Sequence, residues 1–446
     1  MGFSVRKTSA ALAAILLLGA LTGARGQYLE ATIPVGDTPT LLFWNPLSNR
    51  VYCSNEQSGT VTIIDGGTSA VRATVDVADY PSNYGFAARH NKVYCASGMS
   101  NRVNVICGSG DTLVKRLRVY DYPQNMAYSE ERDLLYVVRY DAGQVDVFDA
   151  AVDTVVASIG MSPAGSIQAV WNRASGRLFC ANQAGRYVAV VDCSTNSIVR
   201  AWQLGVSLRG LLSSCRDGRT YASSARALHV LNATGDSLVA TVAVAAFWPT
   251  PLVHYPRLDR LYVMDLNLGQ GSVVDCPTNT VIDSLPSTAV YDAVCDTLRG
   301  KLYVIDRSTD QVLVYRLADN VHLSSIQLGR SPVCMAWNPI DSRVYVSDQM
   351  DNVVFVIRDT STAVAEEATD SVVQRASSRI VHGVLDLPAT GVGRQASSVL
   401  VNAAGSKVAN LRPGLNDVSR LSSGVYFIRR LGPSEPADLE RVLLVR

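Results

Sequence analysis

The chain has 446 residues, of which 48% are hydrophobic, and its formal net charge at pH 7 is +1. This length leaves room for one large domain and one small domain. The chain lacks the basic surplus that nucleic-acid-binding proteins carry, so nucleic acid is excluded as the expected partner. Frequent Val, Thr, Ser and Tyr residues and closely spaced turn residues favour β structure.

The first 26 residues have the pattern of an export signal. Arg6 and Lys7 precede an apolar stretch, residues 10–21, and Ala24-Arg25-Gly26 is an acceptable small-residue cleavage site. The alternative is an uncleaved membrane anchor, but the apolar stretch is short for a bilayer span. We therefore expect residues 1–26 to be a signal peptide, and the mature chain to begin at Gln27 and contain no transmembrane segment.

An aromatic residue inside an apolar run recurs eight times, at intervals of 41 to 43 residues. These anchor residues are Tyr52, Tyr94, Tyr136, Phe179, Tyr221, Tyr262, Tyr303 and Tyr345. Each repeat contains four short strand-like segments, and in the seventh these are residues 293–295, 302–305, 311–315 and 323–328. A period of this size in all-β units is typical of propeller blades.

The fourth segment of each unit has its own marker, a central apolar residue that also recurs eight times. Its positions are Ile33, Val75, Leu117, Ile159, Trp202, Val242, Leu285 and Ile326. The first copy precedes every anchor, and the last anchor unit, residues 333–358, has no such segment behind it. We therefore expect residues 29–35 to pair with residues 353–357, which closes the ring and removes exposed sheet edges. The predicted fold is all-β, an eight-bladed β-propeller over residues 27–360; the alternative is seven blades with one degenerate unit.

Three segments of the first unit match a known repeat pattern: Tyr52-Cys53-Ser54-Asn55, residues 61–65 (VTIID) and residues 73–77 (ATVDV). On these residues the chain resembles the YVTN-type β-propeller repeat family over about three quarters of its length. The Asp that ends the third segment in this pattern is replaced in four units, by Cys107, Asn232, Arg316 and Arg358. The resemblance implies a propeller on an exported or surface protein, and it implies no single activity.

The repeat stops after Arg358, and the composition then changes. Residues 361–374 are small, polar and acidic and indicate a linker, and strand-like segments resume in residues 375–446. This tail resembles the type A C-terminal sorting domain of the type IX secretion system, through residues 404–408 (AGSKV), residues 421–427 (LSSGVYF) and a basic-apolar ending. The resemblance implies a small β-sandwich that engages the type IX secretion machinery and routes the protein through the periplasm to the cell surface or extracellular space. The alternative is a plain β-sandwich with a structural role.

No catalytic constellation is visible in the sequence. The five histidines fall in different units, and no two lie at metal-ligand spacing on one strand: His90, His229, His254, His322 and His382. Nine cysteines are an odd number for an exported protein, and we interpret most of them as small buried residues rather than a disulfide framework. The sequence therefore predicts no cofactor, no metal ion and no catalytic residue.

Basic residues recur two positions before the anchors. They are Arg50, Lys92, Arg177, Arg219, Arg260, Lys301 and Arg343, and Leu134 breaks the series. The strand order places them on the same face as the turns that follow the third segments. We interpret them as partners in ion pairs and capping hydrogen bonds that tie strands together. The alternative is a basic ring that binds an anionic partner.

The opposite face consists of the loops after the anchor strands and the connections between units, and we call it the connector face. The position three after each anchor is polar, and the candidate ligand-binding residues there are Asn55, Arg139, Asn182, Asp265, Asp306 and Asp348. The connections add the aromatic candidates Tyr80, Tyr84, Tyr122, Phe247, Trp248 and Tyr291. Aromatic rings beside hydrogen-bonding groups bind sugars or peptide side chains. The alternative role for each residue is packing between blades or closing a turn.

Our leading hypothesis is a non-enzymatic, monomeric propeller that binds a glycan, a peptide or another surface protein on the connector face. The second is an enzyme of the lyase or lactonase type with an acidic metal site at the mouth of the propeller channel. Three carboxylates or histidines converging there would favour it. The third is a structural envelope component without a ligand.

Overall fold

The computed structural model describes residues 26–267, 270–286 and 289–361, and in the C-terminal part residues 379–381, 384–387, 397–402, 407–412, 414–418, 420–421, 424–431 and 439–444. These residues form 39 strands and one short 3-10 turn, η1 (Ala88–His90). No helix among them is long and apolar enough to cross a membrane. The predicted signal peptide and linker lie outside the described residues, apart from Gly26 and Ser361.

Eight four-stranded antiparallel sheets account for strands β1 to β32, and we number them in chain order. Sheet 1 contains β2 (Pro39–Asn45), β3 (Arg50–Asn55), β4 (Thr60–Asp65) and β5 (Val71–Asp76). Sheet 2 contains β6 (Pro81–Ala87), β7 (Lys92–Ser97), β8 (Arg102–Cys107) and β9 (Thr112–Arg118). Sheet 3 contains β10 (Pro123–Ser129), β11 (Leu134–Arg139), β12 (Gln144–Asp149) and β13 (Thr154–Gly160). Sheet 4 contains β14 (Ser166–Asn172), β15 (Arg177–Asn182), β16 (Tyr187–Asp192) and β17 (Ser197–Gln203).

The second four sheets have the same composition. Sheet 5 contains β18 (Leu208–Ser213), β19 (Thr220–Ser224), β20 (Ala227–Leu231) and β21 (Leu238–Ala243). Sheet 6 contains β22 (Pro249–Tyr255), β23 (Arg260–Asp265), β24 (Gly271–Asp275) and β25 (Thr280–Leu285). Sheet 7 contains β26 (Val290–Asp296), β27 (Lys301–Asp306), β28 (Gln311–Arg316) and β29 (Val321–Gln327). Sheet 8 contains β30 (Pro332–Asn338), β31 (Arg343–Asp348), β32 (Val353–Asp359) and β1 (Gln27–Pro34).

Sheet 8 takes its fourth strand from the other end of the chain. β1 runs antiparallel to β32 with Ile33 opposite Val354, so the strand pairing expected from the repeat is present. Glu30 of β1 accepts hydrogen bonds from the Arg343 guanidinium at 2.5 and 3.0 Å. This pairing covers an edge of β32 that would otherwise leave backbone groups without partners.

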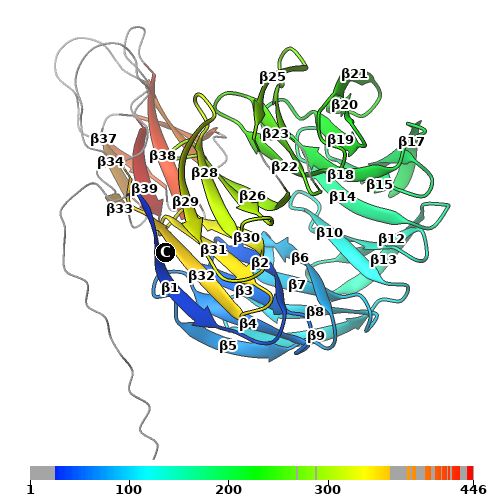
Figure 1. Ribbon diagram of the computed structural model, residues 1–446, viewed down its shortest axis with the longest axis horizontal. Helices are drawn as coiled ribbons and strands as arrows, with labels where there is room; N and C mark the ends of the chain where they lie inside the picture. Colours follow the sequence, from blue (N-terminus) through cyan, green and yellow to red (C-terminus); the bar gives the residue numbers. More distant parts are fainter. Residues whose placement is uncertain are drawn as a thin grey trace, which may run out of the picture.

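Figure 1 shows the sheets arranged around a common centre with their first strands innermost. Those strands contact one another in the order β2, β6, β10, β14, β18, β22, β26 and β30, and β30 contacts β2. Second strands are buried because neighbouring sheets cover both of their faces, and β3 has five of its six residues buried. Fourth strands lie at the rim and are mostly exposed. We call the side that holds the turns between first and second and between third and fourth strands the turn face.

The eight anchor aromatics are fully buried, as the repeat predicts. Several of their hydroxyl groups reach the neighbouring sheet, as when Tyr94 donates to Asp153 at 2.6 Å. Tyr345 of sheet 8 donates to the Gly66 carbonyl in sheet 1 at 2.9 Å. Each of these bonds satisfies a buried hydroxyl and fastens two sheets together.

The basic residues that precede the anchors pair on the turn face. Nitrogen–oxygen distances are 2.7 Å for Arg50–Asp65, 2.9 Å for Lys92–Asp153 and 2.9 Å for Lys301–Asp359. Arg219 and Arg260 donate to backbone carbonyls of the following sheet at 2.5 and 3.1 Å. For these residues the interpretation as ion pairs and caps that tie strands together is confirmed.

All nine cysteines lie in the described part of the chain, and each is unpaired. Six are buried, Cys107 and Cys295 are half-buried, and Cys215 is exposed. The interpretation of most of them as small buried residues is confirmed.

The described strands after β32 form two further sheets. The larger has the order β33 (Arg379–Val381), β39 (Leu439–Leu444), β38 (Gly424–Leu431), β35 (Ser397–Asn402) and β36 (Lys407–Leu411). The smaller pairs β34 (Val384–Leu387) with β37 (Gly414–Asp417). Leu385 of the smaller sheet clusters with Leu400 and Ile428 of the larger, so the two sheets share one hydrophobic core.

Candidate functional site

A polar cavity of about 350 Å³ lies at the connector face, where the first strands of sheets 2 to 5 begin. We call it the mouth pocket. It is lined by Ser82, Asn83, Gln124, Asn125, Ile167, Gln168, Gln183, Arg209 and Trp248. Because β6, β10, β14 and β18 all start on this face, their second and third residues meet at one place. The volume is that of a pocket for a small ligand.

Arg209 is the one charged side chain among the nine that line the mouth pocket. Its guanidinium carbon lies 3.3 Å from the centroid of the Trp248 ring, in a cation–π contact. Burial lowers the pKa of Arg209, and no described carboxylate forms an ion pair with it to offset that burial. The Nε atom of Arg209 also lacks a hydrogen-bond partner among the described residues. The pocket therefore holds a cation whose charge no neighbour neutralises.

The amide side chains of the mouth pocket divide into two groups. Asn125 Oδ1 accepts from the Ala169 amide at 3.0 Å, and Gln168 Oε1 accepts from the Leu211 amide at 2.7 Å, so these two join neighbouring sheets. Gln124 Oε1 is covered by protein atoms and has no partner among the described residues. Buried polar atoms without partners are rare in native proteins and mark sites that a ligand or water completes.

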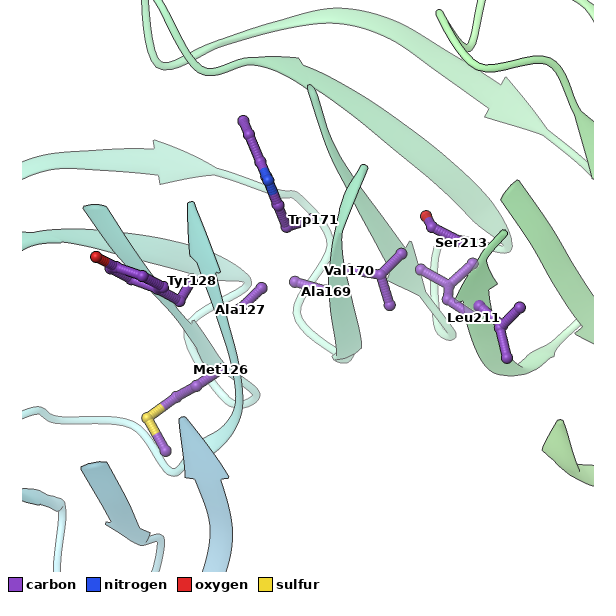
Figure 2. A pocket seen from close by; sticks show the side chains of 9 residues that line it. Met126, Ala127, Tyr128, Ala169, Val170, Trp171, Leu211 and Ser213 are labelled. Atoms are coloured by element: carbon purple, nitrogen blue, oxygen red, sulfur yellow. The ribbon is translucent and has the colours of Figure 1, made fainter. Parts of the chain in front are cut away.

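A second cavity, of about 360 Å³, lies further along β10, β14 and β18. Figure 2 shows its lining side chains on these three strands, among them Met126, Tyr128, Trp171 and Leu211. The Tyr128 hydroxyl already donates to Asp133 at 2.7 Å. This cavity is mainly apolar and offers few free polar groups, so the mouth pocket is the better candidate for a polar ligand.

Most of the polar candidates at the ends of the second strands are buried and fasten the connections between sheets. Asn55, Asn182, Asp265 and Asp348 have no exposed surface, and Asp306 has 6%. Asp265 accepts from the backbone amides of Phe247 and Trp248 at 2.8 and 3.2 Å. The Asn182 amide donates to the carbonyls of Met161 and Pro163 at 2.9 and 2.6 Å. These contacts give the group a structural role beneath the connector face.

Among the predicted polar candidates at the ends of the second strands, Arg139 carries a positive charge, and two carboxylates lie beside it. Its guanidinium pairs with Asp121 and with Asp146, the latter at 3.3 Å, and donates to Gln144 at 2.8 Å. Arg139 is thus neutralised, in contrast to Arg209.

Some of the aromatic candidates make contacts that hold the fold together, and others are exposed. Tyr84 belongs to β6 rather than to a connection, because β6 begins at Pro81, and its hydroxyl accepts from Ser54 at 2.7 Å. The Tyr122 ring packs over Gly98, where an added Cβ would lie 3.0 Å from it. Tyr80 and Phe247 are 38% and 51% exposed. Tyr291 lies in β26 beneath Arg307, 4.7 Å from its ring centroid.

Asp265, Asp306 and Asp348 are the carboxylates among these candidates that an acidic metal site on the connector face would use, and backbone amides donate to all three. Asp348 accepts from Ser331, Met350 and Asp351 at 2.9 to 3.1 Å, and Asp306 accepts from Ser308 at 2.9 Å. Among the described residues, one group of three potential ligands has its atoms within 4.8 Å of one another: His254, Asp259 and Cys276. It lies on the turn face, away from the predicted position.

Sequence reasoning missed Arg209, Gln124 and Gln183. A positional signal existed for Arg209 and Gln124, but not for Gln183, which follows the second strand β15. The second residue of the first strand is polar or aromatic in most sheets: Thr40, Ser82, Gln124, Arg209, Thr250 and Tyr291. The sequence does not show that neighbouring first strands bring these positions to one cavity.

No protein-family model matches this chain, and no curated protein matches it. Solved structures are similar to this chain. One is hydrazine synthase from Kuenenia stuttgartiensis, with TM-score 0.52 and 16% identity over 77% of this chain and 100% of that chain. Another is BamB from Moraxella catarrhalis, with TM-score 0.60 and 13% identity over 74% of this chain and 99% of that chain. At these identities the likeness shows the fold alone, and that fold is a β-propeller.

Proposed function

We propose that this protein is an exported binding module that takes an acidic saccharide into the mouth pocket of its connector face. The observation that carries the proposal is Arg209, a cation without a carboxylate partner in an otherwise uncharged pocket. A charge-assisted hydrogen bond from Arg209 to an anionic group would supply the ion-pair partner that no described residue gives Arg209.

The rest of the lining favours a saccharide over an apolar peptide segment. Five of the nine lining side chains are primary amides, which both donate to and accept from hydroxyl groups. A volume of about 350 Å³ limits the enclosed part of the ligand to a small group. The exposed rings of Tyr80 and Phe247 offer further contacts for the part of a glycan that extends beyond the pocket.

The proposal includes the architecture that holds the pocket. The eight sheets are the blades of one closed propeller, with β1 completing the last blade. The pairing of β1 with β32, the contact of β30 with β2 and the Tyr345–Gly66 hydrogen bond support closure. A closed ring keeps the strands around the pocket in fixed positions, which lowers the entropic cost of binding.

The proposal also includes export. Residues 1–26 act as the signal peptide, and the sorting domain, residues 375–446, engages the type IX secretion machinery on the way to the cell surface. The resemblances of both ends support this route. Deletion of residues 375–446 is expected to leave the propeller in the periplasm. Normal delivery of the truncated protein to the surface would remove the sorting role.

Binding is tested with the full mature chain on an array of acidic and neutral glycans and acidic peptides, followed by calorimetry with matched saccharides that carry or lack a carboxylate. We expect the acidic member to bind and the neutral one to bind at least roughly tenfold more weakly, because a charged hydrogen bond contributes about 1.5–3 kcal/mol. Arg209→Gln is expected to remove that discrimination.

Arg330→Gln is the matched control, because Arg330 follows a fourth strand on the same face, pairs with Asp351 at 2.6 Å and does not line the pocket. It should leave affinity unchanged. Equal binding of acidic and neutral saccharides, or full affinity in Arg209→Gln, would overturn the assignment. Binding of acidic peptides alone would retain the anion site and reject the saccharide.

A further inference from the structure

A cysteine, a histidine and an aspartate meet on the turn face, at the junction of sheets 5 and 6. Cys215 lies in the turn after β18, His254 in β22 and Asp259 in the turn after β22. Cys215 Sγ is 4.0 Å from His254 Nδ1, and His254 Nε2 is 2.9 Å from Asp259 Oδ1. The side chains of His254 and Asp259 are 6% and 8% exposed. Cys215 is the exposed member of the nine cysteines.

The His254–Asp259 contact has counterparts in other sheets. At the equivalent positions of sheet 1, Trp44 Nε1 donates to Asn49 Oδ1 at 3.1 Å. In sheet 3, the Tyr128 hydroxyl donates to Asp133 at 2.7 Å. The side chain at this position of the first strand thus binds the turn that follows the strand. In sheet 6 the residue that holds it is a base.

The hydrogen bonds define the roles of the two imidazole nitrogens. An ionised carboxylate only accepts, so the proton lies on Nε2 and is donated to Asp259. Nδ1 then carries the lone pair, and it is the nitrogen that faces the Cys215 thiol. Arg216 Nε lies 3.7 Å from the other oxygen of Asp259, at ion-pair distance. A nucleophile, a base and a group that orients the base are therefore arranged in sequence.

We propose that Cys215, His254 and Asp259 form a thiol–disulfide exchange site, separate from the mouth pocket. His254 Nδ1 takes the proton of the Cys215 thiol as the sulfur attacks one sulfur of an incoming disulfide. The new bond joins Cys215 to that sulfur, and the other sulfur leaves as a thiolate and receives the proton from Nδ1. The incoming disulfide supplies the oxidising equivalent, so no other oxidant takes part.

The local charges explain why the base matters. Although the Cys215 residue is partly exposed, desolvation of its thiol by the surrounding atoms, together with the charges of Asp259 and Asp217, raises the pKa of that thiol, so little thiolate is present without a base. A metal ion held by His254, Asp259 and Cys276 is the competing arrangement. Arg216 lies against Asp259, and Nε2 already donates to Asp259, so the observed contacts favour the thiol reaction.

The experiment follows the reaction of the full mature chain with oxidised glutathione, using mass spectrometry of the tryptic peptide 210–216, which contains Cys215. The test variant is His254→Tyr, because tyrosine already makes the equivalent turn contact in sheet 3 and cannot act as the base. We expect it to slow modification of Cys215 by roughly tenfold, which is below the usual range for general-base catalysis because thiols are intrinsically nucleophilic.

His90→Gln is the matched control, because His90 Nε2 also binds an aspartate on this face, Asp133 at 2.7 Å, without contacting a thiol. It should leave the Cys215 rate unchanged, and the peptide that contains Cys107 should react equally in all variants. An unchanged Cys215 rate in His254→Tyr, or an equal slowing in His90→Gln, would overturn the proposal. A second arm with an oxidised dithiol protein separates the sources: reaction there assigns a protein partner, and reaction with glutathione alone assigns a small disulfide.

Discussion

Several cations on the turn face have carboxylate partners, whereas the cation of the mouth pocket has none among the described residues. On the turn face, Arg50, Lys92 and Lys301 each lie within 3 Å of a carboxylate oxygen. At the mouth pocket, Arg209 stacks on Trp248 and has no carboxylate partner among the described residues. The difference indicates that the turn-face charges hold the sheets together, whereas the charge of Arg209 has no ion-pair partner among the described residues, as the proposed anion site requires.

The largest effect is expected from breaking the most buried pair of the turn face, Lys301–Asp359. Its side chains are 6% and 1% exposed. Burial raises the pKa of Asp359, but hydrogen bonds from Ser361, Tyr303 and Lys301 outweigh burial, and the net pKa is lowered. Lys301→Met leaves a buried carboxylate without its cation and should cost about 3 kcal/mol in the free energy of unfolding, measured with urea.

The control for this prediction is an exposed pair of the same chemistry. Arg316–Asp319 is 41% and 45% exposed, so Arg316→Gln should change the free energy of unfolding by less than about 0.5 kcal/mol. Equal effects of the two substitutions would show that burial of the turn-face pairs does not determine their contribution.

A smaller effect, with a defined pH dependence, is expected at the strand that completes sheet 8. Hydrogen bonds from Arg343 are the main reason that the pKa of Glu30 lies below its ordinary value of 4.5. Because the folded-state pKa is depressed, the stabilisation is present above the unfolded value and is lost as pH falls through the folded value. Glu30→Gln should cost about 1–2 kcal/mol at neutral pH.

The measurement is urea unfolding of both proteins from neutral pH to well below 4.5, the ordinary pKa of a glutamate. The stability difference between wild type and Glu30→Gln should shrink as pH falls. A gap that is constant over this range would contradict the proposed role of the Glu30–Arg343 pair in holding β1.

A third comparison separates structural rings from exposed rings on the connector face. Tyr84→Phe removes the acceptor for the Ser54 hydroxyl and should cost about 1 kcal/mol. Tyr80→Phe alters a ring that is 38% exposed and should leave the free energy of unfolding unchanged. Thermal unfolding of the two variants gives the comparison, and a stability loss in Tyr80→Phe alone would reverse the two assignments.

Much of the fold was predictable because its signal is repeated. Anchors such as Tyr52 occupy equivalent positions in the eight sheets, and neighbouring sheets cover them on both sides. Each of these buried positions therefore holds an aromatic ring. The pairing of Ile33 with Val354 followed from counting fourth-strand markers against anchors. The replacement of Asp by Cys107 at the end of a third strand left that strand intact, because packing rather than the turn residue determines it.

The site was less predictable, because it depends on what surrounds each residue. Asp265 and Asp348 occupy polar positions as expected, but backbone amides of the connections use their carboxylates. Arg139 and Arg209 are the same residue type on the same face, and only their neighbours distinguish them. The feature that marks Arg209 is a missing counter-ion, and sequence patterns do not show which charges lie apart in space.

The most direct test of the contrast between the two faces measures stability and ligand affinity together in Arg209→Gln. The substitution removes a partly desolvated charge and a cation–π contact, whose effects oppose each other, so the free energy of unfolding should stay within about 1 kcal/mol of wild type. Affinity for the acidic saccharide should fall at least roughly tenfold. A loss of stability like that of Lys301→Met, with affinity retained, would show that Arg209 is a structural charge and would contradict the account.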